Sequence, residues 1–143
     1  MEESISYLKE QFQLESQDIR SYSPLTLAYI GDAIYDLYIR TILVSRGNKQ
    51  ANKLHKEASS LVKAPTQSKL IETLQPLFTE EEEAVYKRGR NAKSYTTAKN
   101  ATTGEYRRAT GFEAVMGYLY LTDQNHRIID LIKIGLESLD DRK

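Results

Sequence analysis

The chain has 143 residues, of which 40% are hydrophobic and 28% are charged, and its formal net charge is zero; this length and composition are typical of one globular domain. It contains no cysteine, which excludes disulfides, thiolate zinc sites and cysteine nucleophiles, and His55 and His126 are far apart in sequence and form no metal-binding pair. Any bound metal would be held mainly by oxygen, which favours Mg²⁺, with Mn²⁺ as an alternative. The N-terminus does not resemble a secretory signal and no apolar run could span a membrane, so we expect a cytoplasmic protein without a membrane partner.

The pattern of apolar residues predicts an all-α fold. Apolar residues mostly recur at three- and four-residue steps, and no segment alternates between polar and apolar residues as a strand would. A short amphipathic helix is expected over residues 4–14. The clearest helix comes next, because Ser23 is a good N-cap, Pro24 suits the first helical position and Gly47 follows the end. Its predicted apolar face contains Leu27, Ile30, Ile34, Leu37 and Val44.

Further helices are expected along the rest of the chain. Two of them run over residues 49–62 and 65–78. Thr79 then caps a fifth helix, with Glu82 placed for a capping box and Gly89 as the expected end. Residues 90–104 are rich in Asn, Ser, Thr and Lys and are predicted to form a loop, after which helices follow over residues 105–122 and 125–139. We therefore expect a single-domain helical bundle that comprises residues 1–143.

Positive charge is concentrated in one stretch of the chain. Between Ala84 and Arg108, seven basic residues stand against one acidic residue, Glu105, so this segment carries a charge of +6 and the remainder −6. This local concentration favours a nucleic-acid partner, although the net charge does not. The alternative is a solvated basic loop that pairs with the acidic residues 80–83. The candidate RNA-binding residues are Lys87, Arg88, Arg90, Asn91, Lys93, Ser94, Lys99, Arg107 and Arg108.

Asp32 is one of two isolated carboxylates in otherwise apolar helices. Between Pro24 and Val44 the only charged residues are Asp32, Asp36 and Arg40. Asp disfavours helix interiors, and a carboxylate near an apolar face costs free energy unless it is paired or binds a cation. Asp36 has Arg40 four residues further on, which predicts an ion pair. For Asp32 the spacing supports two interpretations equally: contact with solvent or a neighbouring helix, or a functional site.

Glu113 is the second isolated carboxylate, because no other charged residue lies between Arg108 and Asp123. It borders the predicted buried side of its helix. If the two helices come together, Asp32 and Glu113 would form an oxygen-ligand site for a hard divalent cation. A buried glutamate bonded to a hydroxyl or to the backbone is the alternative. The predicted buried side contains Phe112, Val115, Met116 and Leu119.

Three motifs resemble those of a known enzyme family. Residues 27–34, Leu-Ala-Tyr-Ile-Gly-Asp-Ala-Ile, are similar to the signature helix of the ribonuclease III family. Residues 109–117, Ala-Thr-Gly-Phe-Glu-Ala-Val-Met-Gly, resemble its second acidic motif, and the order and separation of the two also match. With Lys-Arg-Gly-Arg-Asn-Ala-Lys-Ser at residues 87–94, the motifs resemble most closely the mini-ribonuclease III branch, over nearly the whole chain.

This resemblance implies a Mg²⁺-dependent endoribonuclease domain that cleaves both strands of double-stranded RNA and leaves 5′-phosphate and 3′-hydroxyl ends. For the mini-III branch it implies the maturation of precursor large-subunit ribosomal RNA. By position, Asp32 matches the catalytic aspartate and Glu113 the metal-binding glutamate. The family's other two acids would fall at Ala28 and Thr110, which supply no carboxylate. The number of metal ions is therefore open, and water or Asp36 would complete the coordination.

The resemblance also implies a homodimer. Tyr29 occupies the position of an aromatic residue that enters a pocket of the partner subunit in this family, and a core tyrosine is the alternative. No separate double-stranded-RNA-binding domain is expected, so the catalytic domain would bind RNA alone or with a ribosomal protein. Shape and backbone contacts would dominate, because duplex RNA hides its base edges. Weaker candidates for RNA contacts are Lys63, Thr66 and Gln67.

Other functions fit parts of the sequence. A non-catalytic ribonuclease III-like module that binds double-stranded RNA is favoured by Ala28 and Thr110, whereas Asp32 and Glu113 speak against it. A helical metal-dependent phosphohydrolase would require more His and acidic ligands than this chain offers. A structural adaptor would explain the composition but not the two isolated carboxylates.

Overall fold

The computed structural model describes residues 2–93 and 102–140. These residues form seven α-helices and two short 3-10 turns, and they contain no strand, which confirms the predicted all-α fold. No helix within these two ranges is long and apolar enough to cross a membrane. The helices are α1 (Glu2–Gln11), α2 (Pro24–Ser45), α3 (Ala51–Val62), α4 (Ala64–Leu74), α5 (Glu80–Asn91), α6 (Thr103–Leu121) and α7 (Asn125–Asp140), and the 3-10 turns are Ile19–Ser21 and Gln75–Leu77.

Side chains that cap the helices explain where two of them begin. The Ser23 hydroxyl accepts a hydrogen bond from the Thr26 backbone N–H at 3.1 Å, and Pro24 is the first residue of α2, as predicted. The predicted capping box of α5 is also present, because the Thr79 hydroxyl accepts from the Glu82 N–H and the Glu82 carboxylate accepts from the Thr79 N–H.

Several predicted helix boundaries were wrong by a few residues, among them the end of α1, which lies at Gln11 rather than at residue 14. Helix α4 ends at Leu74 rather than at residue 78, because Pro76 lacks the N–H that would continue the helix and the chain turns into a 3-10 turn. Helix α5 continues two residues past Gly89, which is buried against Gly111 of α6 instead of ending the helix. Helix α6 begins two residues early, because Thr102 and Glu105 form a second capping box.

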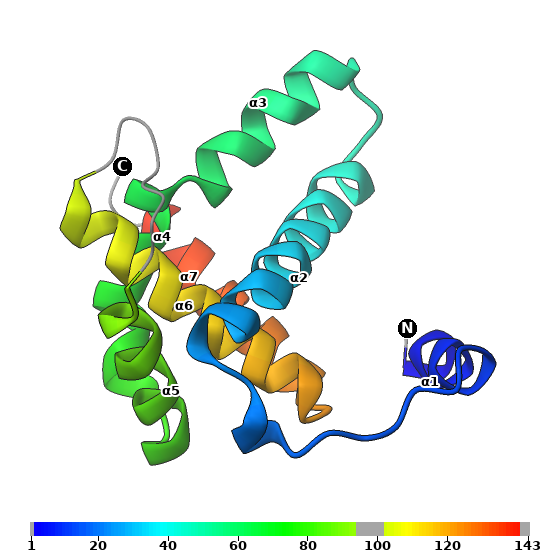
Figure 1. Ribbon diagram of the computed structural model, residues 1–143. Helices are drawn as coiled ribbons and strands as arrows, with labels where there is room; N and C mark the ends of the chain where they lie inside the picture. Colours follow the sequence, from blue (N-terminus) through cyan, green and yellow to red (C-terminus); the bar gives the residue numbers. More distant parts are fainter. Residues whose placement is uncertain (1, 94–101, 141–143) are drawn as a thin grey trace.

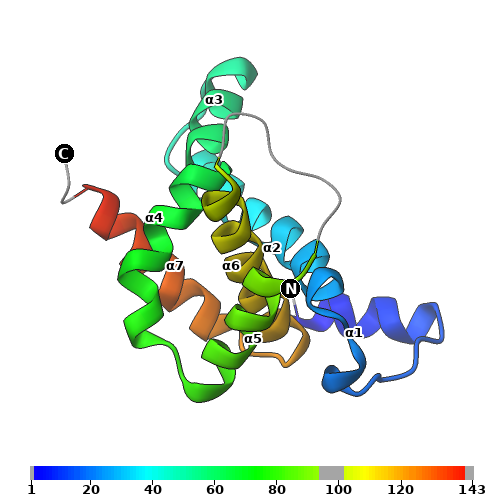
Figure 2. The same ribbon diagram turned by 60° about the vertical axis from the view of Figure 1, so that its left-hand side comes forward.

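Helix α6 lies at the centre of the bundle, with α2, α4, α5 and α7 packed around it (Figures 1 and 2). Its predicted buried side is confirmed, since Phe112, Val115, Met116 and Leu119 are fully buried. On α2 the prediction was partly wrong: Leu27 and Ile34 are buried, but Leu37 and Val44 are exposed. The buried stripe of α2 instead continues through Tyr35, Ile39 and Leu43.

Helix α1 lies at the edge of this bundle, beside the end of α6, and an extended connection joins it to α2 (Figure 1). Two of its large apolar side chains, Tyr7 and Leu8, are exposed, and so are Phe12 and Leu14 just beyond it. The helices that position the candidate site are therefore those from α2 onward.

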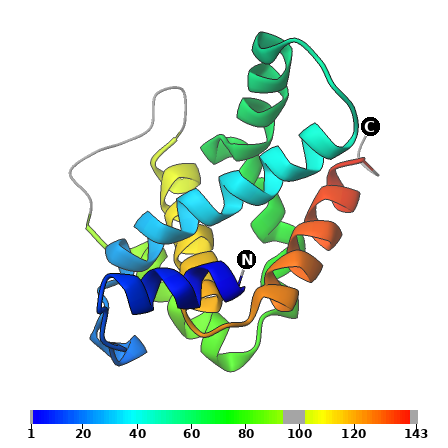
Figure 3. The same ribbon diagram turned by 90° about the vertical axis from the view of Figure 1, so that its right-hand side faces the viewer.

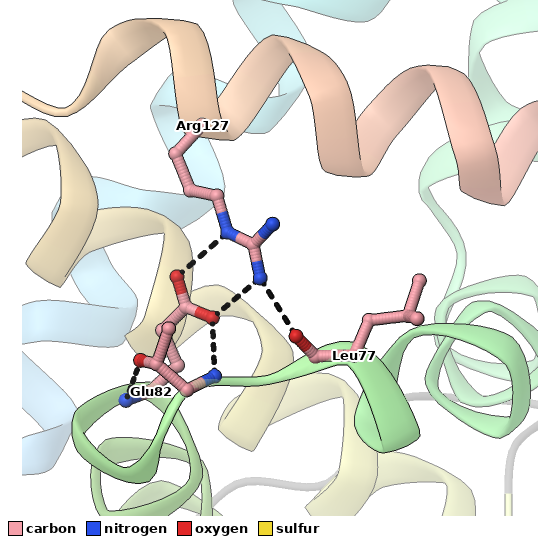
Figure 4. Close-up of polar contacts among 4 residues, drawn as sticks. Leu77, Glu82 and Arg127 are labelled. Carbon is pink, nitrogen blue, oxygen red and sulfur yellow. Dashed lines mark hydrogen bonds and ion pairs between the residues drawn. The ribbon is translucent and has the colours of Figure 1, made fainter.

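An ion pair between the partly exposed Arg127 and the buried Glu82 joins α7 to the start of α5 (Figure 4). Arg127 donates to both carboxylate oxygens of Glu82, each at 2.9 Å, and to the carbonyl oxygen of Leu77 at 2.8 Å. Burial alone would raise the pKa of Glu82, but the hydrogen bonds from Arg127 and from the Thr79 backbone outweigh it and hold the pKa below its usual range. The pair therefore fixes α5 against α7.

We expect Arg127→Met to lower the free energy of unfolding by about 3 kcal/mol at pH 7, because the change leaves the Glu82 carboxylate buried without its partner. Because the pKa of Glu82 is lowered in the folded protein, the ion pair contributes fully to the free energy of unfolding above the ordinary carboxyl pKa of 4.5. This contribution is lost as the pH falls through the lowered pKa. The loss should therefore shrink in acid. Denaturant unfolding of both proteins across this pH range measures it.

Arg20→Met is the matched control for this prediction, because Arg20 forms an ion pair with Asp18 that is exposed. It should leave the free energy of unfolding nearly unchanged, because solvent screens an exposed pair. Equal losses in the two variants would contradict a special role for the pair between Glu82 and Arg127.

Candidate active site

Helices α2 and α6 cross with their backbones in direct contact, and Figure 3 shows the crossing. A Cβ atom on Gly31 would overlap the carbonyl oxygen of Glu113 and would lie 2.6 Å from the backbone nitrogen of Gly117. A Cβ atom on Gly117 would overlap the carbonyl oxygen of Leu27. Only glycine permits this approach at either position. Because Asp32 directly follows Gly31, the crossing brings the two isolated acidic residues together.

The side chains of Asp32 and Glu113 interact at this crossing. Asp32 is exposed at the surface of α2, whereas Glu113 is mostly enclosed. Burial, together with the hydrogen bond and negative charge of the Asp32 carboxyl, raises the pKa of Glu113 to about 8. Two carboxylates in such contact repel each other unless a proton or a cation lies between them. The structure therefore joins two residues that are 81 positions apart in the sequence.

The donor set of this acidic pair fits a hard divalent cation. The side chains that act on the Glu113 carboxyl are Asp32 and Gln67, and neither carries positive charge. Two carboxylates, with water and a substrate phosphate as further ligands, are a common set for Mg²⁺. Among the described residues no group of three or more His, Cys, Asp or Glu could hold a metal ion, so the pair would depend on such external ligands.

Three other positions are candidates for further metal ligands, and none adds a free carboxylate to the acidic pair. Asp36 forms the predicted ion pair with Arg40, with the Arg40 Nε atom 2.9 Å from its carboxylate. Ala28 is buried. Thr110 is also buried, and its hydroxyl donates to the carbonyl oxygen of Tyr106 at 3.0 Å. The positions where the family carries its other acids therefore add no carboxylate.

Gln67 contacts the acidic pair, and its expected role as an RNA contact was wrong. Gln67 and Thr66 are both buried, with 1% and 9% of their surface exposed. The Gln67 amide donates to the carbonyl oxygen of Val62 at 2.7 Å and to the Glu113 carboxylate at 3.3 Å. One signal in the sequence could have indicated its burial, because residues 67, 70, 71 and 74 share one face of α4.

A basic cleft lies between the end of α5 and the start of α6. Four of the predicted RNA-binding residues line it, and Arg90 lies over the ring of Tyr86, 5.6 Å from its centre. Arg108 donates through Nε to the Ser68 hydroxyl at 2.5 Å, and Ser68 follows Gln67 on α4. The first turn of α4 thus connects the basic cleft to the acidic pair. The basic cleft is lined by Gln75, Tyr86, Arg90, Asn91, Gly104, Arg107 and Arg108.

The remaining candidates are placed differently. Lys87 lies 3.7 Å from the Glu83 carboxylate, as the alternative of a paired basic segment predicts, whereas Arg88 and Lys93 are exposed. Ser94 and Lys99 lie outside the described residues. Tyr29 is 81% exposed on α2, so the alternative of a core tyrosine was wrong.

Comparison with known proteins agrees with this fold and identifies its family. A model of the Ribonuclease III domain matches residues 25–124, a range that includes both acidic residues. The chain therefore belongs to the ribonuclease III family.

Several relatives define its place in the family. A protein of Clostridium tetani named Mini-ribonuclease 3 is 48% identical over 90% of this chain and 84% of its own length. A second of that name, from Thermoanaerobacter sp., is 42% identical over 99% of this chain and the whole of its own length. The X-ray structure of a Fusobacterium nucleatum protein matches with a TM-score of 0.77 and 34% identity, over 86% of this chain and 98% of that one. These relatives place the chain in the mini-ribonuclease III branch.

Proposed function

We propose that this protein is a Mg²⁺-dependent endoribonuclease that cleaves double-stranded RNA, with precursor large-subunit ribosomal RNA in the cytoplasm as its substrate. One observation supports the proposal most directly. Asp32 and Glu113 meet at the crossing of α2 and α6, within a ribonuclease III domain, and α6 also carries Arg107 and Arg108 into the basic cleft. The domain that spans residues 1–143 would both bind the duplex and cleave it.

The acidic pair would hold the cation through the carboxylates of Asp32 and Glu113. A bound Mg²⁺ supplies Lewis-acid stabilisation of the charge that develops on the scissile phosphate and acidifies a water molecule. Asp32 is exposed, so a substrate phosphate can approach it from solvent. The Glu113 carboxylate accepts a hydrogen bond from the Gln67 amide. The protein needs no histidine as a base in this scheme. The expected products have 5′-phosphate and 3′-hydroxyl ends.

The basic cleft would hold the RNA backbone. Arg90, Arg107 and Arg108 neutralise phosphates, and Asn91 adds neutral hydrogen bonds. Arg108 has its Nε atom bonded to Ser68, so its two terminal nitrogens would make the phosphate contact. Such contacts follow the shape of the duplex and carry little sequence information.

A homodimer would place two copies of this site on one duplex, one for each strand. The exposed Tyr29 supports this arrangement, because a large aromatic side chain that is 81% exposed gains free energy when a partner covers it. Tyr29 lies one helical turn before Asp32 on α2, so the interface would adjoin the acidic pair.

The direct test is to incubate the purified protein with a duplex segment of precursor large-subunit ribosomal RNA, with Mg²⁺ and with EDTA. We expect cuts in both strands with Mg²⁺, 5′-phosphate ends, and no cleavage in EDTA. A single-stranded RNA of the same sequence is the control and should stay intact. Tight binding of the duplex without cleavage in Mg²⁺ or Mn²⁺ would favour the non-catalytic module instead, for which Ala28 and Thr110 speak.

A further inference from the structure

Gln67 is a buried polar side chain beside the acidic pair, and hydrogen bonding fixes its orientation. Its amide nitrogen lies 2.7 Å from the carbonyl oxygen of Val62, the last residue of α3. Since a carbonyl only accepts hydrogen bonds, the NH₂ group must face it. The second N–H of the same group then points to the Glu113 carboxylate at 3.3 Å. Both donors of Gln67 are therefore used, one on the backbone and one on Glu113.

Among the residues that the structure describes, none provides a hydrogen-bond partner for the amide oxygen of Gln67. A buried acceptor without a partner is costly, and an apolar side chain at this place would avoid that cost. The neighbours of Gln67 on the same face of α4, Leu70, Ile71 and Leu74, are apolar and buried. Packing alone therefore does not explain an amide here, whereas its two bonds, to the Val62 carbonyl and to the Glu113 carboxylate, do.

We propose that Gln67 is a positioning residue, which holds the Glu113 carboxylate in the orientation that grips a divalent cation together with Asp32. The inference rests on the function proposed above. The Val62 carbonyl anchors the amide, and the amide in turn occupies one oxygen of Glu113. The other oxygen, which Gln67 does not contact, is left for the cation. Groups that orient a metal ligand in this way commonly contribute about 10–100-fold to metal affinity or activity.

Gln67→Met tests the inference, because methionine has a similar length and flexibility but no donor. Metal affinity is measured without RNA, from the increase in Tm on titration with Mg²⁺ and from the binding of Mn²⁺ by electron paramagnetic resonance. We expect about 10-fold weaker binding in both measurements. We also expect cleavage by the variant to recover as Mg²⁺ is raised. If Gln67→Met does not fold, Gln67→Leu is used in the same titrations.

Thr66→Val is the matched control. The Thr66 hydroxyl donates to the carbonyl oxygen of Ser60 at 2.6 Å, so this variant also loses a buried bond between α4 and the end of α3. It should lower Tm and leave the affinity for Mg²⁺ and Mn²⁺ unchanged. A Gln67→Met protein that behaves in the same way would overturn the positioning role. Failure of the wild-type protein to bind either cation would instead overturn the proposed function.

Discussion

Replacing Asp32 with asparagine is expected to lower the rate of Mg²⁺-dependent cleavage by about three orders of magnitude, or ~4 kcal/mol of activation free energy. Asparagine keeps the shape of the side chain but removes the charge, so the cation would be held by Glu113 alone. The fold should persist, because Asp32 is exposed. Without metal, and at a pH above about 8 where Glu113 is ionised, the variant should be at least as stable as the wild type, because the Asp32 charge that adds to burial in raising the pKa of Glu113 is gone.

Single-turnover cleavage and thermal unfolding, each with and without Mg²⁺, measure these effects. The matched control is Asp36→Asn, which removes a carboxylate from the same helix that is already paired with Arg40. It should retain cleavage within a few-fold. Full activity of Asp32→Asn would remove this residue from the mechanism, and a large loss in Asp36→Asn would show that Asp36 also serves the metal.

Gly31→Ala is expected to destabilise the fold by about 3 kcal/mol or more, because the new methyl group would overlap the backbone of α6 at Glu113. This loss of stability is opposite in sign to the intrinsic preference of helices, in which alanine is favoured over glycine by about 1 kcal/mol. The two helices would have to separate, and this would move Asp32 away from Glu113. Cleavage should therefore fall even at temperatures at which the variant is folded.

Gly104→Ala is the control for this effect. Gly104 also lies in a helix, but among the described residues a Cβ atom there would meet nothing closer than 3.8 Å. The change should be neutral or should stabilise the protein by up to about 1 kcal/mol in denaturant unfolding. A Gly31→Ala protein as stable as the Gly104→Ala protein would show that the crossing of α2 and α6 tolerates a wider spacing.

The sequence predicted the features of this molecule that depend on neighbouring residues. Ser23 and Thr79 cap their helices as expected, because each needs only backbone N–H groups two or three residues away. Asp32 and Glu113 could be proposed from the sequence as one site, because each is an isolated carboxylate in a mainly apolar helix. Their contact depends on Gly31, whose tight packing against another helix has no local signature beyond its small size.

Features that depend on distant partners could not be predicted in this way. The bond from Gln67 to Glu113 joins residues 46 positions apart, so an amide that looked available for RNA is enclosed. Leu37 fits the helical spacing of a buried face but is exposed, because burial depends on where neighbouring helices lie. Gly89 was expected to end α5, yet it is packed against α6.

The ion pair between Glu82 and Arg127 has a consequence for how RNA would be gripped. It clamps the first turn of α5, while the last turn of the same helix carries Arg90 and Asn91 into the basic cleft. A helix of this length is rigid, so fixing its first turn against α7 also fixes the position of its last turn in the basic cleft. Helix α7 would thus affect the affinity for RNA indirectly, through the position of Arg90 and Asn91.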